Sequence, residues 1–164
     1  MITDVNLLIE KFNNLEALLF EYAGLTANLS SADIELTEET EAIFEKREKL
    51  IEKMKSVTPQ IDELIEKQTT EKAVDIRKMF AGQTVLSDFA EDEKAVQAKI
   101  ITLRSLQSDI LSKDSDNKIK FKRKYDEIRI ELENLQKDKK KLNFYQNVNA
   151  PTDEKIGAKF DNSL

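Results

Sequence analysis

Apolar side chains recur at alternating steps of three and four residues along most of this 164-residue chain. Such spacing places them on one face of a helix and is typical of the seam along which helices pack in bundles and coiled coils. Only three Gly and two Pro interrupt the chain, so long helices meet few breaks. The first seam predicts a helix over residues 4–29. Its members are Val5, Leu8, Phe12, Leu15, Leu19, Tyr22, Thr26 and Leu29.

A second seam predicts a nearly continuous helix over residues 33–69. Its members are Leu36, Thr40, Ile43, Arg47, Leu50, Met54, Val57, Ile61, Leu64 and Gln68. Ser30, Ser31 and Asp33 carry short polar side chains suited to capping its start. Thr58 before Pro59 predicts a second cap, with a kink or restart at that point. Residues 71–81 favour one or two further helical turns, stopped by Gly82.

The third seam predicts a long helix over residues 88–145, with Ser87 or Asp88 as its cap. Its apolar members before and after the middle are Phe89, Val96, Ile100, Leu103, Ile110, Phe121, Tyr125, Ile128, Leu132, Leu135 and Leu142. Residues 112–117 are polar, and Asp114 and Asn117 stand at seam positions. Either the helix breaks there, or a polar layer continues it and fixes its register. The spacing resumes in nearly the same phase, which favours continuity.

Together these patterns predict an all-α fold. We expect an elongated antiparallel helical hairpin, or a three-helix coiled-coil-like bundle, with a long third helix. Residues 1–145 form a single domain in this interpretation. Residues 146–164 show no periodicity and predict a disordered tail.

The composition argues against catalysis. The chain has no His and no Cys, so it lacks the commonest acid–base group, a thiol nucleophile and the usual zinc ligands. Its three Gly are isolated and form no phosphate-binding loop. Carboxylates are abundant, but a long bundle rarely offers the cleft that would perturb their pKa values. We therefore expect a protein that is not an enzyme, with no catalytic residues, no cofactor and no metal.

Charge and hydropathy restrict the partners. The net charge is −6, and no stretch of 18 apolar residues or signal-peptide pattern occurs, so we expect a soluble, cytoplasmic protein without a membrane span. Residues 118–124 are strongly basic and invite a nucleic-acid interpretation. The alternative, that Lys and Arg fill the solvated face of a helix, fits better, and we expect no nucleic-acid partner.

Helix lengths suggest where a protein partner binds. If the chain reverses near residue 84, residue 33 faces residue 135, and if it reverses near residue 78, residue 33 faces residue 124. Either way the end of the third helix extends past its partners and leaves apolar side chains uncovered, which is typical of a binding surface. The candidate partner-binding residues are Ile128, Leu132, Leu135, Leu142, Phe144 and Tyr145, with Ile130 beside them. The alternative is that they pack in a homodimer or against the first inter-helix turn.

Several features together resemble a known family. They are the leucine-rich first helix, the segment Glu45-Lys46-Arg47-Glu48-Lys49-Leu50-Ile51-Glu52-Lys53-Met54, Asn117 within the long helix, the ending Leu142-Asn143-Phe144-Tyr145, and the tail residues Ala158-Lys159-Phe160-Asp161. The chain resembles the flagellar type III export chaperones that escort hook–filament junction proteins, the FlgN/FliT type. The resemblance covers nearly the whole chain.

This resemblance implies a cytoplasmic chaperone without catalytic activity. It would bind a C-terminal helical segment of a hook-associated protein and deliver it to the export gate. The resemblance points to Leu132, Leu135 and Leu142 for the export substrate and to Tyr145 for the gate. Arg47 is either a further partner residue or, as its seam position favours, one that snorkels out or pairs with an acid. The alternative function is a structural, self-associating coiled-coil protein with no chaperone role.

Overall fold

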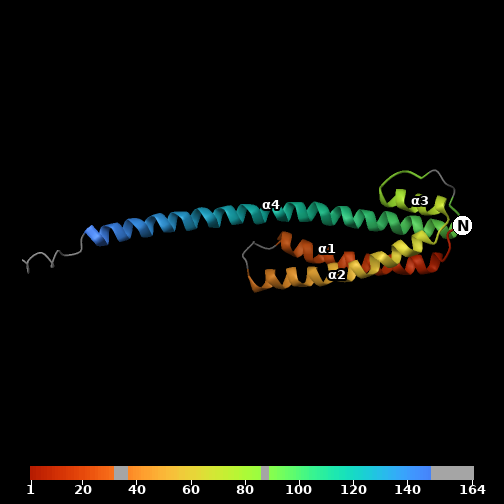
Figure 1. Cartoon of the computed structure of the whole chain (residues 1–164), viewed down its shortest axis with the longest axis horizontal. Helices are drawn as coiled ribbons and strands as arrows, with labels where there is room; N and C mark the ends of the chain where they lie inside the picture. Colours follow the sequence, from red (N-terminus) through yellow and green to blue (C-terminus); the bar gives the residue numbers. More distant parts are fainter. Residues whose placement is uncertain (32–36, 86–88, 149–164) are drawn as a thin grey trace, which may run out of the picture. The chain divides into compact units, whose positions relative to one another are not determined.

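A computed structural model describes residues 1–31, 37–85 and 89–148 of the chain. Four helices and no strand make up this described part. The helices are α1 (Val5–Ser31), α2 (Glu38–Glu66), α3 (Thr70–Phe80) and α4 (Glu91–Val148) (Figure 1). The prediction of an all-α bundle with a long last helix is confirmed, and the helical turns predicted over residues 71–81 form the short helix α3 between the second and the longest helix.

The chain divides into two units, Met1–Phe121 and Lys122–Leu164. The first contains α1, α2, α3 and α4 up to Phe121, and the described part of the second is α4 from Lys122 to Val148. The predicted domain over residues 1–145 spans both units. The tail predicted from residue 146 was placed too early, because residues 146–148 continue α4. Its remaining residues, 149–164, lie outside the described part.

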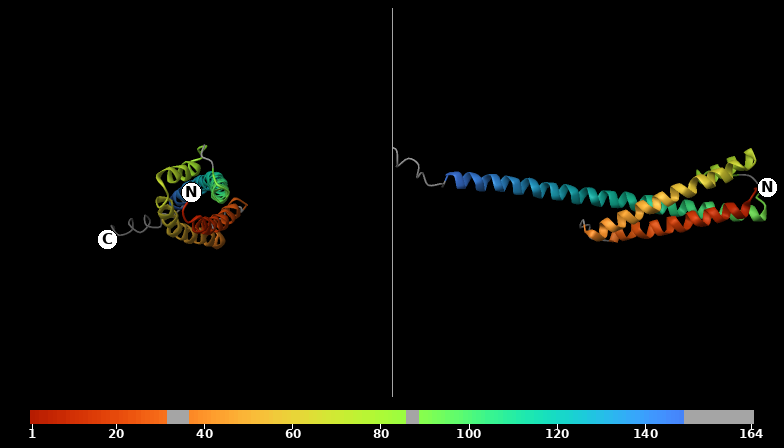
Figure 2. Two further views of the ribbon diagram at one scale, coloured as in Figure 1. Left: turned by 90° about the vertical axis from the view of Figure 1, so that its right-hand side faces the viewer. Right: turned by 60° about the horizontal axis from the view of Figure 1, so that its bottom comes forward.

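Within the first unit, α1 runs parallel to the beginning of α4, and α2 runs antiparallel to both (Figures 1 and 2). The polar contacts follow this order. Ile2 and Glu93 meet near the start of α1, whereas Ser30 near its end contacts Asn117 and Lys120. In the end-on view of Figure 2, α3 lies beside α2 and α4, across from α1.

The predicted seams supply most of the core of the first unit, to which Ile2, Ile65 and the buried face of α3 are added. Leu8, Phe12, Leu15, Leu19 and Leu29 of α1 are buried, as the 3/4 spacing predicts. The other helices bury the following apolar residues: Leu50, Ile61, Leu64, Ile65, Ala73, Ile76, Met79, Val96, Ile100, Leu103 and Ile110. Each buried Leu or Ile side chain contributes about 1.5–3 kcal/mol relative to full exposure. Burial of these seams is therefore the main force that holds the helices together.

The predicted capping residues differ from those observed. Ser30 lies inside α1, where its hydroxyl donates to the Thr26 carbonyl at 3.1 Å, so it does not cap the next helix. Thr37 is the N-cap of α2 and accepts from the Thr40 N–H. The predicted start at residue 33 lies outside the described residues. Thr58 is also no cap, because its hydroxyl donates to the Met54 carbonyl and α2 continues as one helix through Pro59.

The connection from α2 to α4 follows the sequence closely. Residues 70–80 form α3, and Gly82 ends it with a φ of +80°. The Gly82 N–H donates to the Met79 carbonyl and the Gln83 N–H to the Lys78 carbonyl, a Schellman ending that favours glycine at this position. The predicted caps Ser87 and Asp88 lie outside the described residues, and α4 begins at Glu91 rather than at residue 88.

The polar middle of α4 does not break the helix. Asn117 is buried, its Nδ2 donates to the Thr26 carbonyl at 3.2 Å, and its Oδ1 accepts from the Ser30 hydroxyl at 2.8 Å. The expected polar layer is thus present, and it pairs α4 with α1. The predicted pairing of residue 33 lies outside the described residues. Phe44 contacts Phe121, with ring centroids 5.6 Å apart. This pairing of α2 with α4 lies between the two registers that the helix lengths predicted.

Candidate functional site

The second unit carries the predicted partner-binding residues on one exposed helix. Between Lys122 and Val148 every side chain is exposed except that of Asp126, which is half-buried. The exposed fractions of the candidates are Ile128 37%, Leu132 54%, Leu135 65%, Leu142 57%, Phe144 64% and Tyr145 61%. Tyr125, Ile130 and Val148 are exposed as well. We call these nine residues the α4 stripe.

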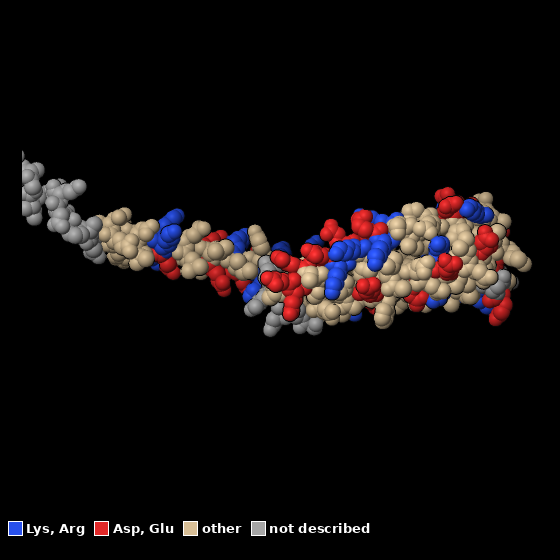
Figure 3. All heavy atoms as spheres, turned by 90° about the horizontal axis from the view of Figure 1, so that it is seen from below, with Lys and Arg blue, Asp and Glu red and all other residues tan. Residues whose placement is uncertain are grey.

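Part of the α4 stripe has the geometry of a helix seam, and no other described residue of the second unit covers it. Tyr125, Ile128, Leu132 and Leu135 follow one another at steps of three, four and three residues, which aligns them on one face of α4. Phe144 and Tyr145 add aromatic surface near its end, with ring centroids 6.0 Å apart. Figure 3 shows uncharged surface alternating with basic and acidic side chains along this segment. A row of exposed apolar side chains of this kind is typical of a protein-binding surface.

A second surface lies in the first unit, between α2 and α4. One hollow of about 340 Å³ is lined by Leu15, Leu19, Met54, Thr58, Ile61, Asp62, Ile65, Arg77, Phe80 and Gln107. A second hollow of about 360 Å³ is lined by Leu19, Tyr22, Ile51, Met54, Gln107, Ile110, Leu111 and Asp114. Leu19, Met54 and Gln107 belong to both, so the two hollows join. We call the joined hollows the α2–α4 groove.

Arg47 lies beside one end of this groove, where it contacts the lining residues Tyr22 and Asp114. Its Nη2 donates to Asp114 Oδ1 at 2.6 Å and to the Tyr22 hydroxyl, and its guanidinium carbon lies 4.4 Å from the Tyr22 ring centroid. The side chain is 12% exposed. Of the two interpretations of Arg47, pairing with an acid is the observed one. The pair joins α2 to α4 above the α1 tyrosine, so Arg47 is engaged within the bundle.

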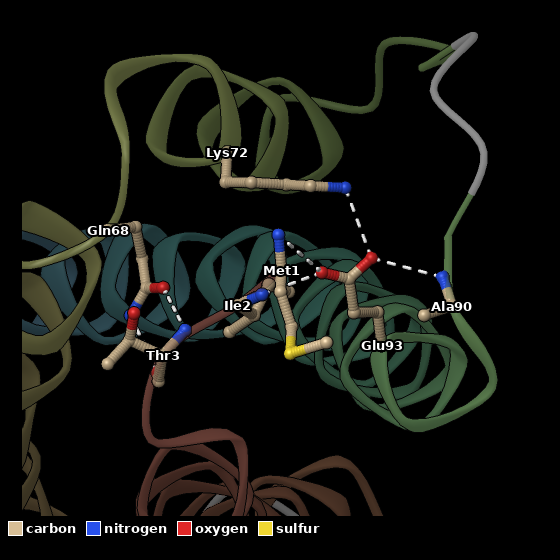
Figure 4. Close-up of polar contacts among 7 residues, drawn as sticks. All are labelled: Met1, Ile2, Thr3, Gln68, Lys72, Ala90 and Glu93. Carbon is tan, nitrogen blue, oxygen red and sulfur yellow. Dashed lines mark hydrogen bonds and ion pairs between the residues drawn. The ribbon is translucent and has the colours of Figure 1, made fainter.

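At the opposite end of the first unit, Glu93 contacts three segments, namely the start of the chain, α3 and the residues just before α4 (Figure 4). Its carboxylate accepts from the Ile2 N–H at 2.6 Å, the Ala90 N–H at 3.1 Å and Lys72 Nζ at 3.1 Å, and the Met1 amino group lies 3.8 Å away. Nearby, the Gln68 amide exchanges hydrogen bonds with the backbone of Thr3. Each group of this cluster is satisfied by the fold itself, which indicates a structural role.

The pKa of Glu93 reflects this cluster. Burial alone would raise the pKa of the carboxyl, because it disfavours the charged form. The hydrogen bond from Ala90, the Lys72 ammonium and the bond from Ile2 outweigh burial, so the pKa lies below its ordinary value. The carboxylate is therefore ionised at neutral pH and holds the start of the chain, α3 and the start of α4 together.

The part of the chain that the structure describes holds neither a metal-ligating cluster nor a membrane-spanning helix. Across residues 1–31, 37–85 and 89–148, no group of three or more metal-ligating side chains comes together. None of the helices placed in those ranges combines the length and apolar composition needed to cross a bilayer. In comparisons with known proteins, the chain matches no family model, no curated protein and no solved structure.

The sequence pointed to the α4 stripe but missed the α2–α4 groove. The sequence places Leu19 and Met54 in seams, and seam residues are expected in the core. Only the arrangement of the neighbouring helices shows that these two residues also line a hollow. The clearest missed signals were Ile51 and Leu111, which lie beside the seams and are 36% and 70% exposed. Apolar residues just off a seam widen the apolar face, and a wide face indicates contact on two sides.

Proposed function

We propose that this protein is a non-catalytic chaperone of the flagellar export type, which binds an amphipathic helical segment of a hook-associated protein through the α4 stripe. The observation that supports it is the exposure of nine large apolar side chains on one helical segment of 27 residues. In water such a surface favours association with another apolar surface. The occupant that fits a single helical seam is a second helix.

The charged residues around the α4 stripe indicate the charge of this partner helix. Residues 117–145 hold ten Lys and Arg against five Asp and Glu. Lys122, Lys124 and Arg129 flank the start of the stripe. If two copies paired in parallel and in register, Lys124 would face Arg129 of the other copy across the seam, and like charges there oppose pairing. A partner helix with acidic residues beside its apolar seam fits this surface better than a parallel second copy.

The test uses the purified full chain as bait in a lysate of the source organism, with bound proteins identified by mass spectrometry. The proposal expects a hook–filament junction protein on the wild-type chain and its loss from the Leu135→Asp, Leu142→Asp double variant. Circular dichroism checks that the variant remains helical. Ile101→Asp is the matched control, because Ile101 is an equally exposed apolar residue of α4 outside the stripe.

Two outcomes would reject the proposal. Recovery of the bait alone, together with a micromolar homodimer in analytical ultracentrifugation that the double variant abolishes, would identify the stripe as a self-association surface. This is the structural coiled-coil function considered above. Equal capture of the junction protein by wild type and double variant would place its binding elsewhere on the chain.

A further inference from the structure

We propose that Lys139 fixes the register of a partner helix on the α4 stripe by pairing with an acidic residue within the apolar seam of that helix. The inference rests on the proposed function, because it requires that a helix of another protein covers the stripe. It adds to that function the residue that decides which helices are accepted. The partner then has a recognisable pattern, an apolar seam interrupted by one Asp or Glu.

Lys139 lies on the same face of α4 as the apolar seam. Past Leu135 the seam continues by a step of four residues to Lys139 and by a step of three to Leu142. The whole run comprises Tyr125, Ile128, Leu132, Leu135, Lys139 and Leu142. Alternating steps of three and four keep these side chains on one face, and all of them are exposed. A helix that covers the apolar members on both sides of Lys139 therefore also covers Lys139.

The Lys139 ammonium has no carboxylate beside it on its own helix. The positions three and four residues away, which a helix places next to it, hold Leu135, Gln136, Leu142 and Asn143. Other basic residues of this segment do have an acidic neighbour. The pairs are Lys124 with Glu127, Arg129 with Glu133 and Lys141 with Asp138, at 3.8, 3.9 and 4.0 Å. Within the described part of the chain no such pair involves Lys139, so its charge is available to a partner.

Covering this charge favours a partner that supplies an anion. An ammonium removed from water loses its hydration, and an apolar neighbour does not replace it. A carboxylate opposite Lys139 offsets that loss through a charge-assisted hydrogen bond. In coiled coils a single polar residue at a seam position specifies the register of the pair. Lys139 occupies such a position, so it favours one alignment of the partner helix over alignments shifted along the seam.

A second copy of the stripe does not supply the required carboxylate. In a parallel pair in register, Lys139 faces Lys139 of the other copy within the seam. In an antiparallel pair over the same run, Lys139 faces Ile128 of the other copy, and Glu131 flanks the seam beside Asp138 of the other copy. Both alignments bring like charges together, and like charges repel. A helix of different sequence can instead place its acidic residue opposite Lys139.

The test adds synthetic amphipathic helices to the full chain. Each peptide is about three heptads long, which covers the run, and carries leucine at its seam positions. Acidic residues beside the seam complement Lys122, Lys124 and Arg129 and keep the peptides from pairing with themselves. One peptide has an uninterrupted leucine seam, and each of the others has Glu at one seam position. In fluorescence anisotropy, the wild-type chain should bind one Glu peptide at least about tenfold more tightly than the other Glu peptides.

Charge reversal identifies the residue that makes this choice. Lys139→Glu should weaken binding of the preferred peptide at least about tenfold, and Lys in place of the Glu of that peptide should restore binding. Lys139→Leu should bind the uninterrupted leucine peptide most tightly. The matched control is Lys140→Glu, which makes the same change in net charge. Lys140 is exposed and has no acidic residue three or four positions away, but it lies off the seam, so the order of the peptides should stay unchanged.

Failure of this inference differs from failure of the proposed function. If the peptides bind, Leu135→Asp, Leu142→Asp abolishes binding and the position of the Glu has no effect, the stripe binds helices without a register set by Lys139. If no peptide binds, or if the double variant binds as the wild type does, the stripe is not a helix-binding surface and both proposals fail.

Other occupants of the stripe would also overturn the inference. A dimer of the free chain in analytical ultracentrifugation that the double variant dissociates would assign the stripe to a second copy. Peptide binding that is absent from the wild type and appears only in Phe160→Asp would assign the stripe to the end of the chain itself.

Discussion

Arg47 and Asp114 join α2 to α4 through a 2.6 Å hydrogen bond between Nη2 and Oδ1, and the guanidinium rests on the Tyr22 ring of α1. Three helices therefore meet at one charged side chain. Asp114→Ala should lower the free energy of unfolding by about 1–2 kcal/mol, because it leaves a largely buried guanidinium without its carboxylate. Arg47→Met, which removes the charge and keeps the apolar stem, should cost less.

Urea denaturation followed by circular dichroism measures both variants. The control is Glu52→Ala, which breaks the exposed Lys55–Glu52 pair on α2 and should leave the urea midpoint unchanged. An Arg47→Met variant less stable than Asp114→Ala would contradict this account, since it would mean that the cation–π contact outweighs the ion pair.

Gly24 and Gly82, the two glycines in the part of the chain that the structure describes, should respond in opposite directions to alanine. Gly82 has a φ of +80°, and a Cβ there would collide with the guanidinium of Arg104, so Gly82→Ala should destabilise the chain by about 1 kcal/mol or more. Gly24 lies within α1 with open space around it, so Gly24→Ala should stabilise the chain by about 0.5–1 kcal/mol. Thermal melts of the two variants provide the comparison, and equal effects would refute the left-handed ending of α3.

Asn117 should contribute to stability through its two hydrogen bonds rather than by packing. Asn117→Ala leaves the Thr26 carbonyl and the Ser30 hydroxyl without this partner inside the bundle. The expected loss is about 1–3 kcal/mol. The matched control is Ser115→Ala, because Ser115 is exposed on the same turn of α4. Unchanged stability of Asn117→Ala in urea denaturation would rule out the polar layer as a stabilising feature.

Stability at acid pH should depend on Glu93. Its pKa is lowered in the folded chain, so the unfolded chain binds a proton at higher pH than the folded one. The stabilisation is present above the ordinary pKa of a glutamate and is lost as the pH falls through the lowered value. Urea midpoints measured from pH 7 to pH 3 should therefore drop for the wild type.

Glu93→Gln isolates the contribution of this carboxylate. The variant should be less stable than the wild type at pH 7, and the difference should shrink as the pH falls. Glu91→Gln is the control, because the side chain of Glu91 is 87% exposed and its loss should leave the pH profile unchanged. A constant difference between Glu93→Gln and the wild type across this pH range would exclude the proposed linkage.

The seams could be predicted from sequence because burial in this fold follows helical periodicity. Thr26, Thr40, Gln68 and Asn117 stand at seam positions despite their polarity, and all four are buried. Periodicity predicts that these polar residues are buried because helix geometry alone decides which positions face the core, whatever side chain occupies them. The same argument supported continuity of α4 through its polar middle.

Helix ends and the groove depended on information that periodicity lacks. Ser30 and Thr58 resemble N-caps in composition, but each hydroxyl bonds to the carbonyl four residues earlier inside a helix. Short hydroxyl side chains make either bond, so composition cannot choose between them. The groove exists because α3 stops at Phe80 while α2 and α4 continue beside one another. That mismatch of lengths appears only when the helices are assembled.

The parallel arrangement of α1 and α4 constrains the order of events during synthesis. The bonds between Ile2 and Glu93 and between Thr26 and Asn117 each join residues 91 positions apart. The N-terminal helix α1 therefore emerges from the ribosome long before α4 has been synthesised. Until then the apolar face of α1 can pack only against α2, in a helical hairpin. Contacts of such separation slow folding and lengthen the exposure of apolar surface. A nascent chain of this protein is most vulnerable to aggregation before residue 117 has been translated.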